Sequence, residues 1–278
     1  MGGMQILTTV VRIYNPDFRG ARRATRRQIC FDGRPFPHYD NGMNEADFVF
    51  RGDLSQFLPL RLRGEVVRVA FEDHQTVKHL IESLGIPHVE IGEILANRAP
   101  VGPAYRPGNE DRIEVRPPAP GCSIEPRFVL DNHLGRLAAS LRMLGFDCLY
   151  QNDFEDSQMA GLLADDPRIL LTRDRRLLMR NAVQFGYCVR SLEPDVQLRE
   201  VVRRFDLSGR VTPFRRCLRC NSLLQPVAKV EVLDRLEPKT KLYYDEFRIC
   251  RTCDQVYWKG SHFERMQELV AEVSSQSK

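Results

Sequence analysis

Long apolar runs are absent from this 278-residue sequence, since no stretch approaches the roughly 20 consecutive apolar residues that a membrane-spanning helix requires. The opening residues, MGGMQI, lack a basic segment followed by an apolar run, and Ile6 stands where an N-myristoylation signal has Ser or Thr. We therefore expect no secretory signal, no lipid anchor, no membrane partner and a cytoplasmic location.

Several familiar catalytic signatures are also absent. The segment DNHLGRL is neither a dinucleotide-binding fingerprint nor a P-loop. The chain has no H-E-x-x-H motif of zinc proteases and no G-x-S-x-G nucleophile elbow. The sequence therefore gives no indication of chemistry that depends on those motifs.

A strong charge of either sign is missing too. The net charge is +4, with 42% apolar and 28% charged residues, which is ordinary for a globular protein long enough for two cores. This balance is compatible with a polyanionic partner but does not establish one.

Cysteine is plentiful, with eight residues in the chain. Four of them form two C-x-x-C pairs, Cys217 with Cys220 and Cys250 with Cys253, separated by 29 residues. In a chain without a secretory signal, such pairs favour a metal site over disulfides or free thiols. Because four thiolates complete a tetrahedral shell, we predict a structural Zn²⁺.

The first part of the chain predicts an arm followed by an α+β domain. Residues 1–45 are rich in Arg without sustained periodicity, which indicates a flexible arm or, alternatively, a nucleic-acid-binding tail. Residues 46–118 read as two strands, a helix that ends at Gly85 and two more strands, the order of a ubiquitin-like β-grasp domain. We interpret this domain as a docking module for a protein partner.

The second part predicts an α/β domain with an attached ribbon. Residues 119–126 are a Pro-rich linker. Strands and helices then alternate with short loops over residues 127–208, which indicates a parallel sheet flanked by helices. Residues 209–270 hold the zinc ribbon and the C-terminal segment.

Acidic residues follow the first three strands of the predicted parallel sheet. Asp131 follows the first strand, Asp153 and Asp156 the second, and Asp174 the third. Ligands bind beyond the C-terminal ends of such strands, and crowded carboxylates suit Mg²⁺ or Mn²⁺. The alternative is that Asp131, Asp156 and Asp174 each cap a following helix, a role in which Asp is also favoured.

Basic and aromatic residues near these two regions are candidates for RNA contact. Arg136 and Arg173 flank the acidic edge, while Arg219, Trp258 and His262 surround the cysteines. Such a mixture suits phosphate contact and stacking on single-stranded bases. Alternatively, Trp258 packs the ribbon against the α/β body, and His262 is a spare zinc ligand.

The runs FVLDNHLGRLAASLRMLGFD, LLTRD, RCLRCNSLL and CRTCDQVYWKGSH together resemble the Mut-seven C-terminal domain family, over about residues 127–270. The segment TVKHLIESLGIPHVEIGEILAN, within residues 46–118, resembles the ubiquitin-like domain often fused in front of it. The resemblance implies a PIN-like ribonuclease fold with a zinc ribbon at its C-terminal end.

The same resemblance implies roles for the acidic residues. Asp131, Asp156 and Asp174 map to the residues expected to bind Mg²⁺ or Mn²⁺ in PIN-like nucleases, with Asp153 as an additional candidate. PIN nucleases usually have a fourth acid near the last, but here Arg175 and Arg176 follow Asp174, which leaves the number of metals open.

The leading hypothesis is therefore a ribonuclease that hydrolyses phosphodiester bonds of RNA with a carboxylate-bound metal. The alternative is a non-catalytic RNA-binding or adaptor protein that uses the zinc ribbon and basic surface. The sequence leaves open the RNA target, the endonuclease or exonuclease mode and the oligomeric state.

Overall fold

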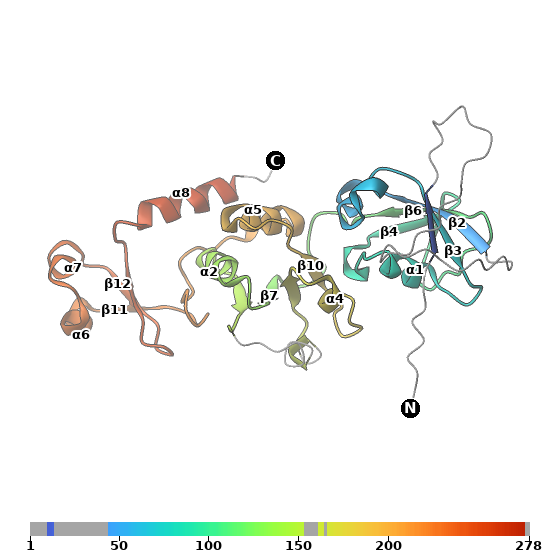
Figure 1. Ribbon diagram of the computed structural model, residues 1–278. Helices are drawn as coiled ribbons and strands as arrows, with labels where there is room; N and C mark the ends of the chain where they lie inside the picture. The colour runs from blue at the N-terminus through green and yellow to red at the C-terminus, as the bar shows by residue number, and fades with distance from the viewer. Residues whose placement is uncertain (1–9, 14–43, 153–160, 164–165, 276–278) are drawn as a thin grey trace. The chain divides into compact units, whose positions relative to one another are not determined.

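A computed structural model describes residues 10–13, 44–152, 161–163 and 166–275 (Figure 1). The chain divides into two compact units, Met1–Ala119 and Pro120–Lys278. Within the described residues, no helix is both long and apolar enough to cross a membrane.

The described residues of unit 1 form a six-stranded mixed sheet and one α-helix, α1. Its elements are β1 (Val10–Ile13), β2 (Asn44–Phe50), β3 (Val67–Phe71), α1 (Val77–Ser83), β4 (Glu93–Ala96), β5 (Ala99–Val101) and β6 (Arg112–Arg116), with 3₁₀ turns at Gly52–Phe57, Leu60–Leu62 and His88–Glu90. The strand order is β1-β3-β2-β6-β4-β5. β2 pairs antiparallel with β3 and parallel with β6, so the predicted β-grasp arrangement is confirmed.

Local sequence explains the elements of unit 1. β2 alternates between buried and half-buried residues, and Phe48 is fully buried. Thr76 caps α1, because its hydroxyl accepts a hydrogen bond from the backbone N–H of His79. The helix buries one apolar face, which carries Leu80 and Ile81.

The expectation of a flexible arm over residues 1–45 is wrong for two short stretches. Val10–Ile13 form β1, which pairs antiparallel with Val67–Ala70, and β2 already begins at Asn44. The β-branched run TTVVRI suits a strand, but it is too short to stand out among the surrounding arginines. The remaining residues of the predicted arm, 1–9 and 14–43, lie outside the described residues.

Unit 2 begins with a four-stranded, fully parallel sheet in the order β10-β9-β7-β8. Its elements are β7 (Arg127–Leu130), α2 (Gly135–Met143), β8 (Asp147–Leu149), β9 (Ile169–Thr172), α4 (Arg175–Leu178), β10 (Gly186–Cys188) and α5 (Pro194–Phe205), with a 3₁₀ turn at Ser208–Arg210. The predicted parallel α/β sheet flanked by helices is confirmed.

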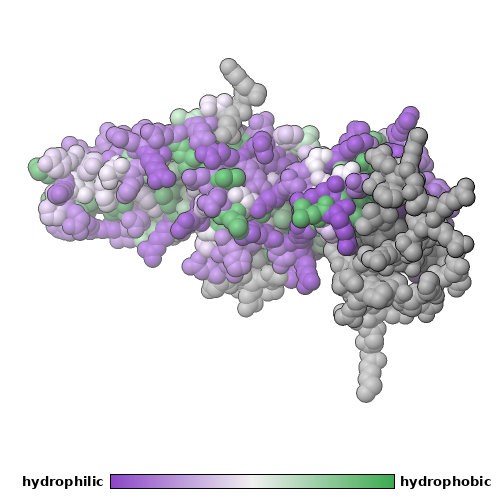
Figure 2. Space-filling model, turned by 45° about the horizontal axis from the view of Figure 1, so that its top comes forward, coloured by the Kyte–Doolittle hydropathy of each residue, from purple (hydrophilic) through white to green (hydrophobic). Residues whose placement is uncertain are grey.

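The core of unit 2 lies between the sheet and helices α2 and α5. Phe128 from β7, one of the two inner strands, packs edge-on against Phe146 and Phe205. The strands are nearly continuous apolar runs, as expected where both faces of a sheet are covered. Outside this core the face drawn in Figure 2 is mainly hydrophilic, with small apolar patches.

The rest of unit 2 is a small antiparallel sheet followed by a helix that returns to the core (Figure 1). Its elements are β11 (Gln225–Val227), α6 (Lys229–Val232), α7 (Pro238–Tyr243), β12 (Phe247–Ile249), β13 (Val256–Trp258) and α8 (Phe263–Ser274), with a 3₁₀ turn at Leu233–Arg235. Val273 of α8 is fully buried in the α/β core, and Arg199 of α5 pairs with Glu272 at 2.6 Å.

Candidate functional site

Asp131 follows β7 at the C-terminal edge of the parallel sheet, and its carboxylate is held from three directions. It is buried, with 6% of its surface exposed. Its Oδ1 accepts from the N–H of His133 at 3.0 Å, while its Oδ2 accepts from the hydroxyl of Thr172 and from the N–H of Arg173 at 3.2 Å. The carboxylate orientation is therefore fixed by the ends of β7 and β9 together.

Thr172 links Asp131 to Asp174. Its hydroxyl donates to Asp131 and accepts a hydrogen bond from the backbone N–H of Asp174 at 2.9 Å. Asp174 is exposed and uses Oδ1 to accept from the N–H of Arg176 at 2.8 Å. Among the described side chains, no Lys or Arg forms an ion pair with Asp131 or Asp174.

The helix-capping alternative holds for Asp174 but not for Asp131. Asp174 is the N-cap of α4, as that alternative predicted. For Asp131 the capping prediction is wrong, because α2 begins at Gly135 and its N-cap residue is Leu134. The carboxylate of Asp131 instead accepts hydrogen bonds from the N–H of His133 in the following turn and from the N–H of Arg173 after the neighbouring strand.

The loop after β8 supplies the remaining acidic candidates. Asp153 and Asp156 lie outside the described residues, so their positions stay predictions. The described start of this loop reaches the same edge of the sheet, because the hydroxyl of Tyr150 donates to the carbonyl of Asn132 at 3.0 Å and pairs with Asn152 at 2.7 Å.

The two arginines predicted beside this edge are both exposed. Arg173 follows β9 directly, and Arg136 lies in the first turn of α2. Neither guanidinium has a carboxylate partner within the described part of the chain. Both therefore remain candidates for contact with a phosphate backbone.

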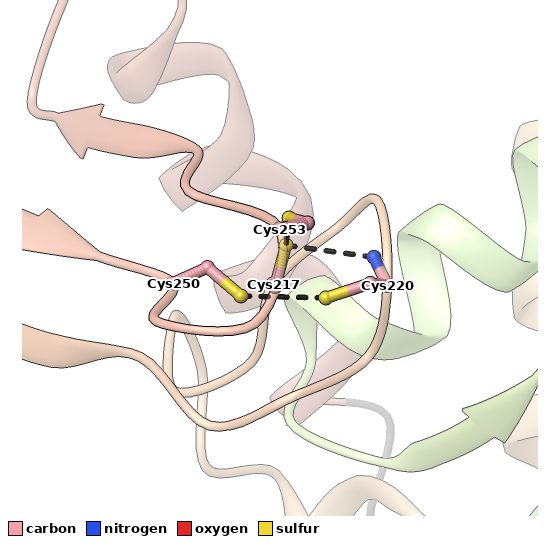
Figure 3. Close-up of side chains that lie close together, drawn as sticks. All are labelled: Cys217, Cys220, Cys250 and Cys253. Carbon is pink, nitrogen blue, oxygen red and sulfur yellow. Dashed lines mark hydrogen bonds between the residues drawn. The ribbon is translucent and has the colours of Figure 1, made fainter.

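The four cysteines of the two C-x-x-C pairs converge, as Figure 3 shows. The sulfur of Cys217 lies 3.5 Å from that of Cys253, and the sulfur of Cys220 lies 3.3 Å from that of Cys250. All four lie within 4.8 Å of one another, and over the residues described here they are the one such group of three or more. Zn–S bonds of about 2.3 Å place tetrahedral sulfurs about 3.8 Å apart, so the cluster fits a structural Zn²⁺.

Proximity also couples the protonation of these thiols. Burial raises the pKa of Cys220, but hydrogen bonds with Ser222 and the neighbouring thiols outweigh it and lower that pKa to about 6. Burial and the hydrogen bonds to neighbouring thiols raise the pKa of Cys253 to about 12. One thiolate therefore forms readily and opposes the next, a repulsion that a divalent cation relieves.

The first cysteine loop, residues 217–221, and the second, residues 250–254, have the same backbone hydrogen bond. In each loop the first cysteine's carbonyl accepts from the N–H four residues later, Asn221 at 2.9 Å and Asp254 at 2.8 Å. Asn221 has φ +74° and Asp254 has φ +61°, a left-handed conformation that Asn and Asp tolerate better than most residues. Both side chains are therefore of the type that the turn requires.

The first cysteine loop also closes the outer edge of the parallel sheet. β8 is an edge strand, and the N–H of Cys148 donates to Oδ1 of Asn221 at 3.0 Å. Buried Arg142 donates to the carbonyl of Cys148 at 2.7 Å and to the carbonyls of Leu218 and Arg219 at 3.0 and 2.9 Å. Side chains thus occupy hydrogen-bonding positions that another strand would fill.

The aromatic and basic residues around the cysteines have different environments. Tyr257 is half-buried, its hydroxyl 3.1 Å from Cys217 Sγ and accepting from the N–H of Leu218, so it supports the first cysteine loop. Trp258 is 39% exposed, and Arg219 and His262 are exposed. His262 precedes α8 and is not among the four clustered ligands.

Sequence reasoning missed Thr172, Asn221 and Arg142. Thr172 ends a strand directly before an acidic candidate, and that position alone is a weak signal. Asn221 directly follows a C-x-x-C pair, where a left-handed turn is common. Arg142 gave no signal, because a buried arginine on a helix cannot be distinguished by spacing from an exposed one.

The described structure is that of an α/β protein with a four-cysteine ribbon. Acidic residues lie at the C-terminal edge of its parallel sheet, and a β-grasp domain precedes it in the chain. Residues 126–270 match the family model described as Mut7-C RNAse domain, and residues 43–121 match that described as Mut7-C ubiquitin. The chain belongs to the Mut7-C RNAse domain family. No curated protein and no solved structure gives a match.

Proposed function

We propose that this protein is a metal-dependent ribonuclease whose site is the C-terminal edge of the parallel sheet. The observation that carries the proposal is that Thr172 connects the carboxylate of Asp131 to the backbone N–H of Asp174, so that two acidic residues follow neighbouring strands, and neither has a Lys or Arg partner in the described structure. Carboxylates that follow neighbouring strands at one edge of a sheet without a cationic partner favour a bound cation. The family match supplies the expectation of RNA as substrate.

Asp131 and Asp174, with Asp156 and Asp153 as further candidates, would hold Mg²⁺ or Mn²⁺. When bound, the metal supplies an activated water and neutralises charge on the phosphate. The chain's own residues orient the site: Thr172 and the N–H of Arg173 fix the carboxylate of Asp131. Arg136 and Arg173 would contact the RNA backbone.

The other parts of the molecule have supporting roles in this proposal. The cysteine cluster would hold a structural Zn²⁺ that keeps the first cysteine loop against β8. Its thiols would stay reduced in the cytoplasm, the location that we propose. The ubiquitin-like unit would dock a protein partner.

Cleavage of a fluorescently labelled single-stranded RNA during a Mn²⁺ titration tests the proposal. Wild type should give Mn²⁺-dependent products, and Asp174→Asn should give none while it keeps the fold, because Asn caps α4 as well as Asp does. The matched control is Asp206→Asn, at the exposed left-handed residue after α5, which should cleave like wild type.

RNA binding by wild type without any metal-dependent product would contradict the proposal. That result would instead favour an adaptor that holds RNA without cleaving it. Salt sensitivity of the binding would then report phosphate contacts alone.

A further inference from the structure

A cavity of about 540 Å³ lies in the ribbon, beside its three-stranded sheet and the start of α8. This volume falls within the range of small-molecule sites. Most of its lining is apolar or aromatic, and no role in the proposed metal chemistry uses it. The residues that matter for the argument are Phe214, Phe247, Arg248, Trp258 and Phe263.

Two aromatic pairs line this cavity. The rings of Phe214 and Phe263 have centroids 4.8 Å apart at an angle of 42°. The rings of Phe247 and Trp258 have centroids 6.5 Å apart at an angle of 50°. Phe214, Trp258 and Phe263 are all partly exposed, so their surfaces are accessible to a ligand.

The backbone holds Phe214 at the cavity in an unusual conformation. Its φ is +58°, which is rare for a bulky side chain. Two hydrogen bonds fix it there: its N–H donates to the carbonyl of Met143 at 2.8 Å, and its carbonyl accepts from Nη1 of Arg248 at 3.2 Å. Such conformations persist only where surrounding structure enforces them, and they gather at binding sites.

Among the described residues that line the cavity, one cation has no carboxylate partner. Lys259 pairs with Glu246 at 2.6 Å, and Lys229 pairs with Asp245 at 2.8 Å, so both acidic residues of the lining are neutralised. Arg248 is exposed and has no carboxylate partner in the described structure. Its guanidinium can therefore contact an anionic group of a ligand that enters the cavity.

We propose that this cavity holds one unpaired nucleobase of a single-stranded RNA, stacked against the exposed aromatic rings, with Arg248 on a neighbouring phosphate. Aromatic rings beside a guanidinium that no carboxylate neutralises are the combination that binds single strands without a strong sequence preference. The inference rests on the proposed function for its RNA substrate, and it assigns the ribbon the task of holding the strand by a base.

Fluorescence tests this assignment directly, because Trp258 is the one tryptophan of the chain and lines the cavity. The full-length, zinc-loaded protein is titrated with a six-nucleotide oligoadenylate RNA in buffer free of Mg²⁺ and Mn²⁺. Trp258 emission should change saturably. An equally long sugar-phosphate strand without bases should leave the emission unchanged, and an equal response to it would overturn the proposal.

Two variants identify the contacts. Phe263→Leu keeps an apolar side chain but removes a ring, and it should weaken oligoadenylate binding about tenfold. Arg248→Gln should also weaken binding and lower the salt dependence by about one phosphate contact. The matched controls are Tyr243→Leu, an exposed ring of α7, and Arg251→Gln, an exposed arginine of the second cysteine loop; neither lines the cavity.

The outcomes separate this inference from the ribonuclease proposal. Base-dependent quenching without any Mn²⁺-dependent cleavage would keep the cavity assignment and contradict the nuclease. Mn²⁺-dependent cleavage by wild type without any change in Trp258 emission would keep the nuclease proposal and overturn the cavity assignment. If Phe263→Leu fails to fold by circular dichroism, Arg248→Gln decides, and unchanged affinity and salt dependence in that variant would overturn the proposal.

Discussion

At the scale of single residues, one buried hydroxyl organises the acidic edge. Thr172 is fully buried and makes two hydrogen bonds, donating to Asp131 and accepting from the N–H of Asp174. Buried polar groups that lose a partner are costly, so both neighbours depend on this hydroxyl. The orientation of the Asp131 carboxylate is thereby coupled to the position of the Asp174 backbone.

We expect Thr172→Val to disturb the site more than the fold. Val keeps the shape but removes the hydroxyl, so the free energy of unfolding should fall by about 1–3 kcal/mol. Mn²⁺-dependent RNA cleavage should fall at least tenfold, because Asp131 loses an orienting donor. Thr172→Ser restores the hydroxyl and should recover most cleavage; equal cleavage by Val and Ser variants would contradict this role.

Asp147 carries a pH-dependent part of the stability. Burial raises its pKa, but hydrogen bonds from Arg168 at 2.8 Å and Asn221 at 2.9 Å outweigh burial and hold the pKa below its ordinary value. A carboxyl whose pKa is lower in the folded state stabilises the fold above its unfolded pKa of about 3.9. That contribution is lost as the pH falls through the folded pKa.

Urea unfolding between about pH 6 and pH 2 checks this prediction. Asp147→Asn should be less stable than wild type near pH 6 by about 1–3 kcal/mol. The difference should shrink at low pH, where wild type is protonated as well. The two proteins are compared at equal measured zinc content, so that the difference between them isolates Asp147; a constant difference over this pH range would contradict the assignment.

At the scale of elements, the contact between β8 and the first cysteine loop joins the parallel sheet to the ribbon. β8 is a three-residue edge strand, and Asn221 and Arg142 satisfy the backbone of Cys148 on its open side. Asn221 also donates to Asp147. The ribbon is therefore part of the hydrogen bonding of the sheet.

Asn221→Gly should destabilise unit 2 by about 1–3 kcal/mol without loss of zinc, since glycine keeps the left-handed turn but removes both side-chain hydrogen bonds. Asp254→Gly is the matched control, because it occupies the equivalent left-handed position of the second loop and its carboxylate pairs with exposed Arg235. Chemical unfolding together with zinc quantification compares them. Equal losses of stability would show that the sheet does not depend on Asn221.

The sequence predicts elements well where periodicity or spacing carries the signal. The helix of unit 1 ends where Gly85 indicates, and the strands after residue 127 lie where apolar runs occur. The two C-x-x-C pairs likewise predict the cysteine cluster. In contrast, β1 is a short run hidden among arginines, and the contact of Asn221 with β8 joins residues 73 positions apart. Long-range contacts of this kind depend on packing, which a pattern within one segment cannot show.

At the scale of the whole molecule, the chain is two compact units, and the cysteine cluster lies in the second. Removal of zinc should therefore act within unit 2 alone. The cysteine loops should lose their structure, and β8 should lose the cover that Asn221 provides. Unit 1 has its own buried core and should remain folded.

Hydrogen exchange before and after chelation checks this expectation. Amides of the ribbon strand Phe247–Ile249 and of Cys148 should exchange much faster in the metal-free protein, while those of β2 and β6 should be unchanged. Readdition of Zn²⁺ should restore protection. Unchanged protection at Phe247–Ile249 would contradict a structural metal, and faster exchange in unit 1 would contradict its independence.

The central claim is that carboxylates from separate strands of unit 2 hold one divalent cation. Anomalous diffraction at the manganese edge, from crystals soaked in Mn²⁺, tests it most directly. The account predicts a peak at the C-terminal edge of the sheet, with oxygens of Asp131 and Asp174 among its ligands. A well-ordered edge without a peak, with those oxygens bound only to Thr172 and nearby backbone N–H groups, would contradict it.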